Sequence, residues 1–222
     1  MLLYINKMTS KINVLQVIPK LGFGGAETGC YDIAHYLAEK DCGSYIATSG
    51  GELLKFVKKN KVKIFRVPVH SKNPITILLN TVLLSAYILI KKINIVHARS
   101  RAPAWSSYLA CLITNTIFVT TFHGTYNFNN KFKKFYNSIM LRSNLIIAGS
   151  NFIFGHINDN YSEYLNKKKK LRVVFRGINI DYFNPKNISV LKQEKLKREW
   201  RLEPNKFIIL MPGRLTYWKG QE

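Results

Sequence analysis

The sequence is poor in acidic residues. It contains 12 Asp and Glu against 34 Lys and Arg, which gives a formal net charge of +22 over 222 residues. Because unpaired charges are rarely buried, most of this surplus must lie on the surface. There it favours anionic partners: nucleic acid, the acidic face of a membrane or phosphorylated small molecules. The alternative is a compositional drift toward Lys, Asn and Ile, in which part of the charge has no function.

Several features of common enzyme and metal sites are also missing. The three cysteines form no C-x-x-C pair and no disulfide framework, which fits a reducing cytosol. No two histidines have the spacing of metal ligands, so zinc is not expected. There is no Asp-x-Asp pair to hold Mg²⁺ or Mn²⁺ at a diphosphate, and no G-x-S-x-G motif of a serine hydrolase. We therefore expect no metal site and no cofactor.

The sequence has no evident signal peptide and no apolar run long enough to cross a membrane. Residues 1–10 lack a sustained apolar core and a small-residue cleavage site, and either Met1 or Met8 can be the start. The run from Ile75 to Ile90 has 16 residues, fewer than the ~20 that a crossing helix needs. We expect a buried or interfacial helix, whose two terminal lysines suit an anionic leaflet.

Apolar segments typical of buried strands alternate with helical segments along the chain. With 47% apolar residues, the chain can form a substantial core. This alternation predicts an α/β fold with a doubly wound, Rossmann-like parallel sheet. The expected strands cover residues 11–18, 45–48, 63–67, 94–97, 116–122, 144–148, 171–175 and 207–211. The expected helices cover residues 26–38, 52–60, 74–90, 105–113 and 191–200, with two more after residues 136 and 151.

Glycines and polar residues lie just after four of these strands. The carboxyl ends of parallel strands share one edge of a sheet, and ligands of such sheets bind outside that edge. We therefore expect these residues to lie around one site. They are Gly24 and Gly25, Arg99 and Arg101, His123, and Arg214 with Lys219.

The segment Gly22-Phe23-Gly24-Gly25 leads from the first strand into a helix. Free backbone amides at a helix N-terminus bind anions, so the turn is a candidate phosphate site. It is not a G-x-G-x-x-G fingerprint, because Glu27 occupies the sixth position, and it is not a Walker loop. Tight packing is the alternative reason for these glycines. Near the end of the chain, the forked donors of Arg214 and the point charge of Lys219 suit a diphosphate.

His123 ends a strand and is followed by Gly124, which lets a ligand or a backbone segment approach closely. One hypothesis is that the imidazole faces a reaction centre. The alternative is a histidine that only hydrogen-bonds the backbone at the end of its strand.

Five segments, in this order, resemble landmarks of glycosyltransferase family 4. They are Gly24-Gly25-Ala26-Glu27 and residues 97–105, 121–125, 176–179 and 213–221. The resemblance runs from about Ile12 to the last residue and is closest to bacterial members linked with lipopolysaccharide and other cell-envelope glycans. It implies a GT-B fold, in which two Rossmann-like domains face each other across a cleft. Residues 11–183 would form the acceptor-side domain, and residues 184–222 a linker and the start of the donor-binding domain.

The resemblance also implies an activity and a set of residue roles. Family members transfer a sugar from a nucleotide-sugar donor to an acceptor, usually with retention of configuration and without a metal. Gly24 and Gly25 would lie by the donor phosphates, and His123, as the catalytic residue, near the transferred sugar. Arg214 and Lys219 would neutralise the departing diphosphate electrostatically. The residues implied on the acceptor side are Glu27, Arg99 and Arg101.

The chain departs from the family pattern at its end. The second domain of the family continues well beyond the position of Glu222 and contains a paired-glutamate motif that this sequence does not show. The alternative function is therefore an inactive truncated remnant, or one half of a split enzyme that acts only as a binding domain with a separate C-terminal half. Because residues 207–211 would lack strand neighbours, we expect them to dock abnormally or to be poorly ordered.

The main hypothesis is a glycosyltransferase that acts on a lipid-linked or cell-envelope glycan acceptor. We expect it at the cytoplasmic face of the membrane, attached peripherally to anionic lipid by its basic surface and by the apolar helix near Ile75. Nucleic-acid binding is suggested by net charge alone. Since the aromatic residues fall inside apolar elements and no recognised module occurs, we expect no nucleic-acid partner.

Overall fold

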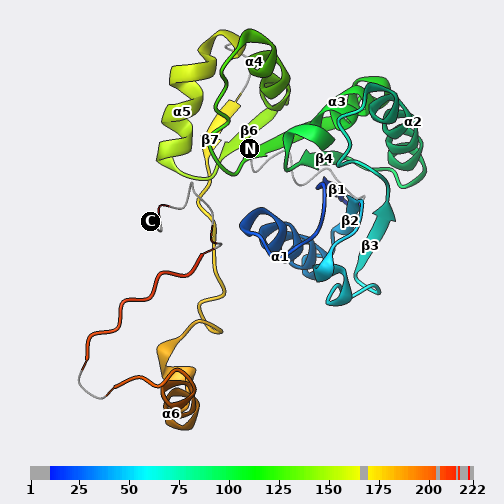
Figure 1. The fold of residues 1–222 in the computed structure, drawn as a ribbon. Helices are drawn as coiled ribbons and strands as arrows, with labels where there is room; N and C mark the ends of the chain where they lie inside the picture. The colour runs from blue at the N-terminus through cyan, green and yellow to red at the C-terminus, as the bar shows by residue number, and fades with distance from the viewer. Residues whose placement is uncertain (1–10, 166–169, 204–205, 214, 216–219, 221–222) are drawn as a thin grey trace, which may run out of the picture. The chain divides into compact units, whose positions relative to one another are not determined.

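A computed structural model of the chain describes residues 11–165, 170–203, 206–213, 215 and 220 (Figure 1). The chain divides into two compact units: unit 1 ends at Arg176, and unit 2 begins at Gly177. Unit 1 contains a sheet with helices on both of its faces, which confirms the predicted α/β, Rossmann-like architecture.

The sheet of unit 1 has seven strands in the order β3-β2-β1-β4-β5-β6-β7. Every neighbouring pair is parallel. The strand order reverses between β1 and β4, where doubly wound sheets place their ligands. The strands are β1 (Asn13–Val17), β2 (Gly43–Thr48), β3 (Val62–Arg66), β4 (Ile95–Ala98), β5 (Ile117–Phe122), β6 (Leu145–Ala148) and β7 (Lys170–Val173).

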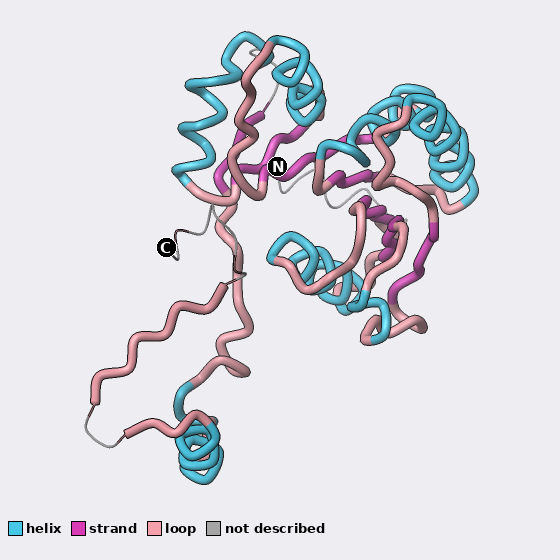
Figure 2. The backbone as a smooth tube through the Cα atoms, viewed as in Figure 1, coloured by secondary structure: helices cyan, strands magenta, loops and turns pink. Residues whose placement is uncertain are grey.

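The helices of unit 1 form a layer on each face of the sheet. Figure 2 shows one long helix, α1, on one face and the helices α2 to α5 on the other. The α-helices are α1 (Gly25–Glu39), α2 (Pro74–Ile90), α3 (Arg101–Thr114), α4 (Lys131–Ser138) and α5 (Asn151–Tyr161). The 3₁₀ turns of unit 1 are η2 (Glu52–Lys55), η3 (Ile139–Leu141) and η4 (Ser162–Tyr164).

Two apolar clusters fill the spaces between the sheet and these helices. The larger cluster lies under α2 to α5 and includes Leu15 and Val17 of β1. The smaller cluster lies under α1 and η2 and includes Ile18 and Ile46. Because successive strand residues point to opposite faces, a nearly continuous apolar strand such as β1 supplies both clusters. This explains why the strands are apolar without alternation.

Local sequence signals account for where two of the helices begin. At α2, the side chain of Asn73 accepts hydrogen bonds from the amides of Ile75 and Thr76, and Pro74 occupies the first helical turn. At α5, the hydroxyl of Ser150 accepts a hydrogen bond from the amide of Ile153. The apolar helix α2 has 17 residues. Among the described helices, none is long and apolar enough to cross a membrane.

Unit 2 contains the turn η5 (Pro185–Asn187) and the helix α6 (Val190–Glu199). The strand expected over residues 207–211 does not form. Residues 206–213 have no regular structure, and Phe207 is fully exposed to solvent. No described segment of unit 2 offers these residues a strand to pair with, which is the physical reason. The helix expected over residues 52–60 was also wrong, since only the short turn η2 forms before the chain turns into β3.

Candidate functional site

Five polar side chains meet at the carboxyl edge of the sheet, on the face that α1 covers. On β4, Val96 and Ala98 belong to the apolar cluster of the opposite face. Strand alternation therefore turns the residues between and after them toward α1. Register brings the neighbouring strands together here, since Gln16 of β1 pairs with His97 of β4. The same alternation along β1, β4 and β5 turns five polar residues toward α1: Gln16, His97, Arg99, Thr121 and His123.

Arg99 carries a charge that the described residues do not neutralise. The residue is only 3% exposed, and its Nε donates to Oε1 of Gln16 at 2.8 Å. Gln16 is held in turn, because its Nε2 donates to the carbonyl oxygen of Cys30 on α1 at 2.9 Å. None of the ion pairs among the described residues includes Arg99. Its Nη2 is buried and has no hydrogen-bond partner in the described part of the chain.

The electrostatics of the site follow from this buried cation. Burial lowers the pKa of Arg99, Cys30 opposes this effect, and the charge of Arg176 lowers the pKa further. Burial also lowers the pKa of His97 well below its usual range, with Arg99 and His123 adding to the effect. Nε2 of His97 is hydrogen-bonded to Oγ1 of Thr121 at 2.7 Å. His97 is therefore a neutral, fixed member of the site.

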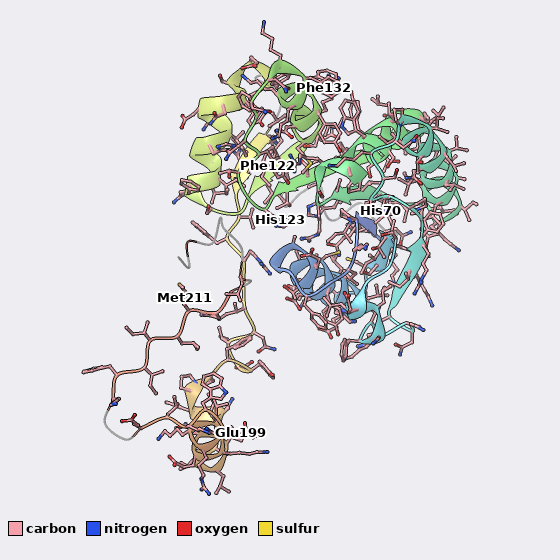
Figure 3. All side chains as sticks on the ribbon, viewed as in Figure 1. His70, Phe122, His123, Phe132, Glu199 and Met211 are labelled. Atoms are coloured by element: carbon pink, nitrogen blue, oxygen red, sulfur yellow. The ribbon has the colours of Figure 1, made fainter. Side chains whose placement is uncertain are left out.

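His123 lies directly after the buried Phe122, at the end of β5 (Figure 3). Burial first, and then the charges of Arg99 and Arg176, lower the pKa of His123 to about 4. Its Nε2 is buried and has no partner among the described residues. At neutral pH the imidazole is therefore uncharged and keeps one ring nitrogen for a hydrogen bond to a ligand. A Cβ atom on Gly124 would meet open space, so no described group crowds this position.

The glycine turn before α1 leaves room for two charged side chains. A Cβ atom on Gly24, the N-cap of α1, would overlap the carboxylate of Glu27, and one on Gly25 would overlap the guanidinium of Arg176. Nη2 of Arg176 also donates to Oγ1 of Thr28 at 3.3 Å. The first turn of α1 is therefore covered by Arg176, an exposed residue that follows β7. A larger residue at either position would displace the flexible end of one of these side chains.

Arg101 differs from Arg99, because the contacts of its guanidinium group are supplied by described residues. Its Nη1 donates to Oδ1 of Asn137 at 2.8 Å, and its guanidinium lies over the ring of Tyr126 at 4.5 Å. Asn137 is fully buried and also donates to the hydroxyl of Tyr161 at 2.9 Å. These contacts give Arg101 a packing role between α3 and α4. Its expected position on the acceptor side remains a prediction.

The structure brings most of the predicted site residues together within unit 1. Gly24, Gly25, Glu27, Arg99 and His123 all lie at or beside the carboxyl edge of the sheet near α1. Arg214 and Lys219, the two residues expected at the donor diphosphate, lie outside the described residues.

Sequence reasoning missed four residues of the site: Gln16, His97, Thr121 and Arg176. A signal existed for Gln16, because it is the one polar residue in the buried apolar run of residues 14–18, and a polar residue in such a run needs hydrogen-bond partners. The position of Arg176 over α1 could not be read from the sequence, because it depends on how β7 directs the chain back toward the first helix.

Comparisons with known proteins agree with this fold. A sequence model of glycosyltransferase family 4 matches residues 23–182. A crystal structure of a glycosyltransferase from Rickettsia africae is 44% identical, with a TM-score of 0.81, and the match covers 95% of this chain and 55% of that one. The protein therefore belongs to glycosyltransferase family 4, and it spans about half the length of that relative.

Two more distant structures share the fold. Anabaena HepE, solved in complex with UDP-glucose, is 17% identical with a TM-score of 0.71, and the match covers 95% of this chain and 55% of that one. Sucrose-phosphate synthase from Thermosynechococcus elongatus is 12% identical with a TM-score of 0.65, and the match covers 87% of this chain and 53% of that one. No curated protein sequence matches the chain.

Proposed function

We propose that the protein takes part in the transfer of a sugar from a nucleotide-sugar donor to a cell-envelope glycan or lipid-linked acceptor. The observation that carries this proposal is the family match combined with a neutral histidine beside an unneutralised arginine at the edge of the sheet. A diphosphate leaving group needs positive charge, and sugar hydroxyls need hydrogen-bond partners. The site offers both.

In this proposal, each predicted residue has a chemical task. Gly24 and Gly25, at the start of α1, lie by the donor phosphates, and Arg214 and Lys219 neutralise the diphosphate as it departs. His123 is uncharged at neutral pH and hydrogen-bonds the transferred sugar through its free ring nitrogen. We propose retention of configuration and metal-independent transfer, with arginine and lysine charge in place of a metal ion.

The test of this proposal is a transfer assay with a matched pair of histidine variants. The full chain is incubated with UDP-glucose and with bacterial membranes as the source of acceptor, and the release of UDP is measured. We expect His123→Ala to lower the rate by about tenfold or more, the value of one lost hydrogen bond to a polar substrate. His70→Ala, at an exposed position outside the site, is the control and should leave the rate unchanged.

The same assay decides between this function and that of a binding domain. Equal rates for His123→Ala and for the unmodified protein would remove His123 from the reaction. No UDP release from any nucleotide-sugar, with nucleotide binding retained, would favour a domain that only binds substrate or that works with a separate C-terminal half.

We further propose that unit 1 docks on an anionic membrane surface through α2, the end of α3 and α4. Large apolar side chains on these helices face solvent; Ile75 is 79% exposed and Ile90 72%. The other strongly exposed apolar residues of this surface are Leu78, Leu79, Val82, Leu89, Leu112, Ile113 and Phe132. Contiguous exposed apolar patches of this kind mark interaction sites.

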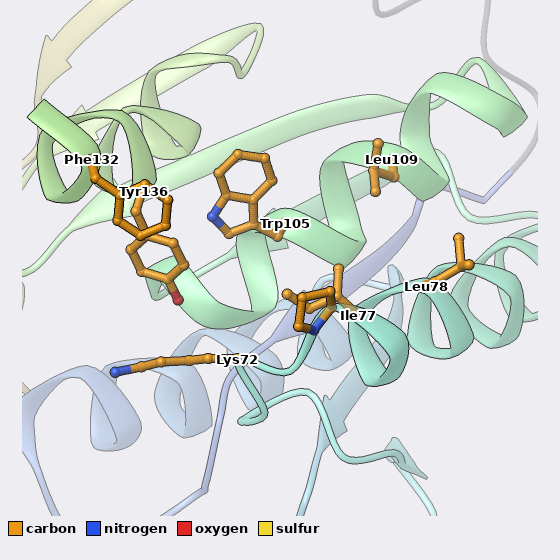
Figure 4. A pocket seen from close by; sticks show the side chains of 8 residues that line it. Lys72, Ile77, Leu78, Trp105, Leu109, Phe132 and Tyr136 are labelled. Atoms are coloured by element: carbon orange, nitrogen blue, oxygen red, sulfur yellow. The ribbon is translucent and has the colours of Figure 1, made fainter.

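An apolar groove with a volume of about 460 Å³ lies within this surface (Figure 4). Trp105, Phe132 and Tyr136 from α3 and α4 line one side, and Ile77 and Leu78 from α2 line the other. The lining is almost wholly apolar, which suits an alkyl chain of a lipid. Lys72 at one end is suited to an anionic headgroup.

Charge complementarity supports a membrane as the partner. Between Glu52 and Asp159 the chain has 106 consecutive residues without a single Asp or Glu, and 15 of them are Lys or Arg. The segment includes all of α2, α3 and α4. Two of these lysines, Lys61 and Lys134, pair with Glu39 and Glu163. Apolar side chains beside the remaining positive charge are typical of a surface that binds anionic lipid.

Vesicle sedimentation tests this docking surface. Vesicles that contain phosphatidylglycerol should retain the protein, and vesicles of phosphatidylcholine alone should retain much less. The variant Leu78→Glu/Val82→Glu should lower retention, whereas Phe152→Glu, at an exposed position on α5, should not. Equal retention by both kinds of vesicle, or equal effects of the two variants, would contradict the proposed surface.

A further inference from the structure

The positive charge of Arg99 is not explained by folding alone. The guanidinium is almost completely buried, yet its one hydrogen-bond partner among the described residues is the uncharged amide of Gln16. A buried charge that is not paired lowers stability, whereas an apolar side chain of similar size in the same place would not. A residue that lowers the stability of the free protein is commonly kept for a ligand that supplies the missing charge.

The surroundings of Arg99 add to its positive charge. Arg176 lies close enough to lower the pKa of both Arg99 and His123. The N-terminus of α1, a 15-residue helix, opens beside Arg176 and carries partial positive charge. Acidic groups also line the turn, with Glu27 beside Gly24 and Glu52 beside Gly22, but neither forms an ion pair with Arg99.

We propose that Arg99 binds an anionic group of the acceptor, a phosphate or a carboxylate, beside His123. This inference rests on the proposed function, which already assigns the donor diphosphate to the start of α1 at Gly24 and Gly25 and to Arg214 and Lys219. The charge of Arg99 then remains for a second anion, and the acceptor is the other substrate. The protein would thereby select acidic acceptors, such as a sugar phosphate or a sugar acid, over neutral ones.

The geometry explains how the site would discriminate between acidic and neutral acceptors. Gln16 accepts a hydrogen bond from Nε of Arg99 and is itself held by the backbone of Cys30, so the guanidinium cannot move out to solvent without breaking its hydrogen bond to a fixed partner. A fixed, desolvated guanidinium favours an anion with two oxygens that accept hydrogen bonds side by side. A neutral hydroxyl would leave the buried charge unpaired, so a neutral acceptor would bind more weakly.

The test is calorimetric titration of the full chain with inorganic phosphate, at constant ionic strength. We expect phosphate to bind, and we expect Arg99→Met to weaken the binding by about tenfold or more, as one charge-assisted hydrogen bond would. Arg66→Met removes the same charge from the exposed end of β3 and is the matched control. Arg99→Lys keeps the charge but not the fork and should bind phosphate with intermediate affinity.

The melting temperature without ligand separates a binding role from a structural one. If Arg99 is kept for a ligand, Arg99→Met should melt at the same temperature as the unmodified protein or higher, and phosphate should no longer raise it. If Arg99→Met melts several degrees lower or does not fold, and phosphate does not stabilise the unmodified protein, the residue is structural and the inference is wrong.

Competition identifies the source of the anion. Glucuronate, a sugar acid, should compete with phosphate in a manner that depends on Arg99, while UDP should leave phosphate bound. Displacement of phosphate by UDP, again dependent on Arg99, would assign the site to the donor and overturn the acceptor assignment. Sugar transfer by a protein that binds no phosphate would refute this inference and leave the proposed function standing. Phosphate binding that depends on Arg99, without any transfer, would count against the proposed function; it would leave an anion site at Arg99 but remove its assignment to an acceptor.

Discussion

Acidification should destabilise unit 1 through His123. The pKa of this histidine is lowered from 6.5 to about 4 in the folded protein, by burial and by the charges of Arg99 and Arg176. Above pH 6.5 the side chain is neutral in both the folded and the unfolded state, so it has no effect on the pH dependence. As the pH falls below 6.5, the unfolded state takes up a proton that the folded state refuses, and stability is lost until the folded state also protonates near pH 4.

The size of the effect follows from the shift. One pKa unit corresponds to about 1.4 kcal/mol, so a change from 6.5 to about 4 corresponds to at most about 3 kcal/mol of unfolding free energy. Solvent reaches part of the side chain, which makes this an upper bound. His97, whose pKa is also lowered, contributes in the same direction.

Urea unfolding followed by circular dichroism at pH 7.5, 6 and 4.5 measures this dependence. His123→Asn removes the titrating group, so its unfolding free energy should fall less steeply with acidification than that of the unmodified protein. His70→Asn, at an exposed position, should behave like the unmodified protein. Parallel curves for His123→Asn and the unmodified protein would show that the pKa of this histidine is not lowered in the folded protein.

Three further predictions concern stability. Asn137→Ala should lower the unfolding free energy by about 2–4 kcal/mol, because it leaves buried partners of a fully buried amide unsatisfied, which urea unfolding would measure. Gln16→Met should destabilise by about 1.5–3 kcal/mol, and much less when Arg99→Met is already present, so a double-mutant cycle should give a coupling of that order. Leu15→Ala, at a fully buried position, should cost about 2–5 kcal/mol, whereas Ile90→Ala, at a position 72% exposed, should change stability by less than about 0.5 kcal/mol.

The fold of unit 1 was predictable because each of its strands carries its own signal. A nearly continuous apolar run, followed by glycine or a polar residue, identifies a strand that is covered on both faces. The seven strands of unit 1 formed within two residues of the expected bounds. The prediction failed at residues 52–60, where local propensity favoured a helix but only the turn η2 forms. At residues 207–211 the expected strand also does not form, and the lack of strand neighbours that the sequence already implied accounts for this among the described residues.

The sequence predicted which edge of the sheet carries the candidate site, but it did not predict the contacts among the side chains there. The rule that ligands bind at the carboxyl edge of a parallel sheet was enough to group Arg99 and His123. It could not distinguish Arg99, whose charge is left unneutralised, from Arg101, whose guanidinium packs on Tyr126 two residues later. That difference depends on Gln16, which is 83 positions away in sequence from Arg99.

The most direct test of this account is the pKa of His123, measured by NMR of the imidazole with and without inorganic phosphate. In the free protein the pKa should lie near 4. An anion bound to Arg99 offsets the positive charge that disfavours the imidazolium, so phosphate should raise the pKa of His123, and should do so much less in Arg99→Met. A pKa that phosphate leaves unchanged in the unmodified protein would contradict the claim that this edge of the sheet binds an anion beside His123.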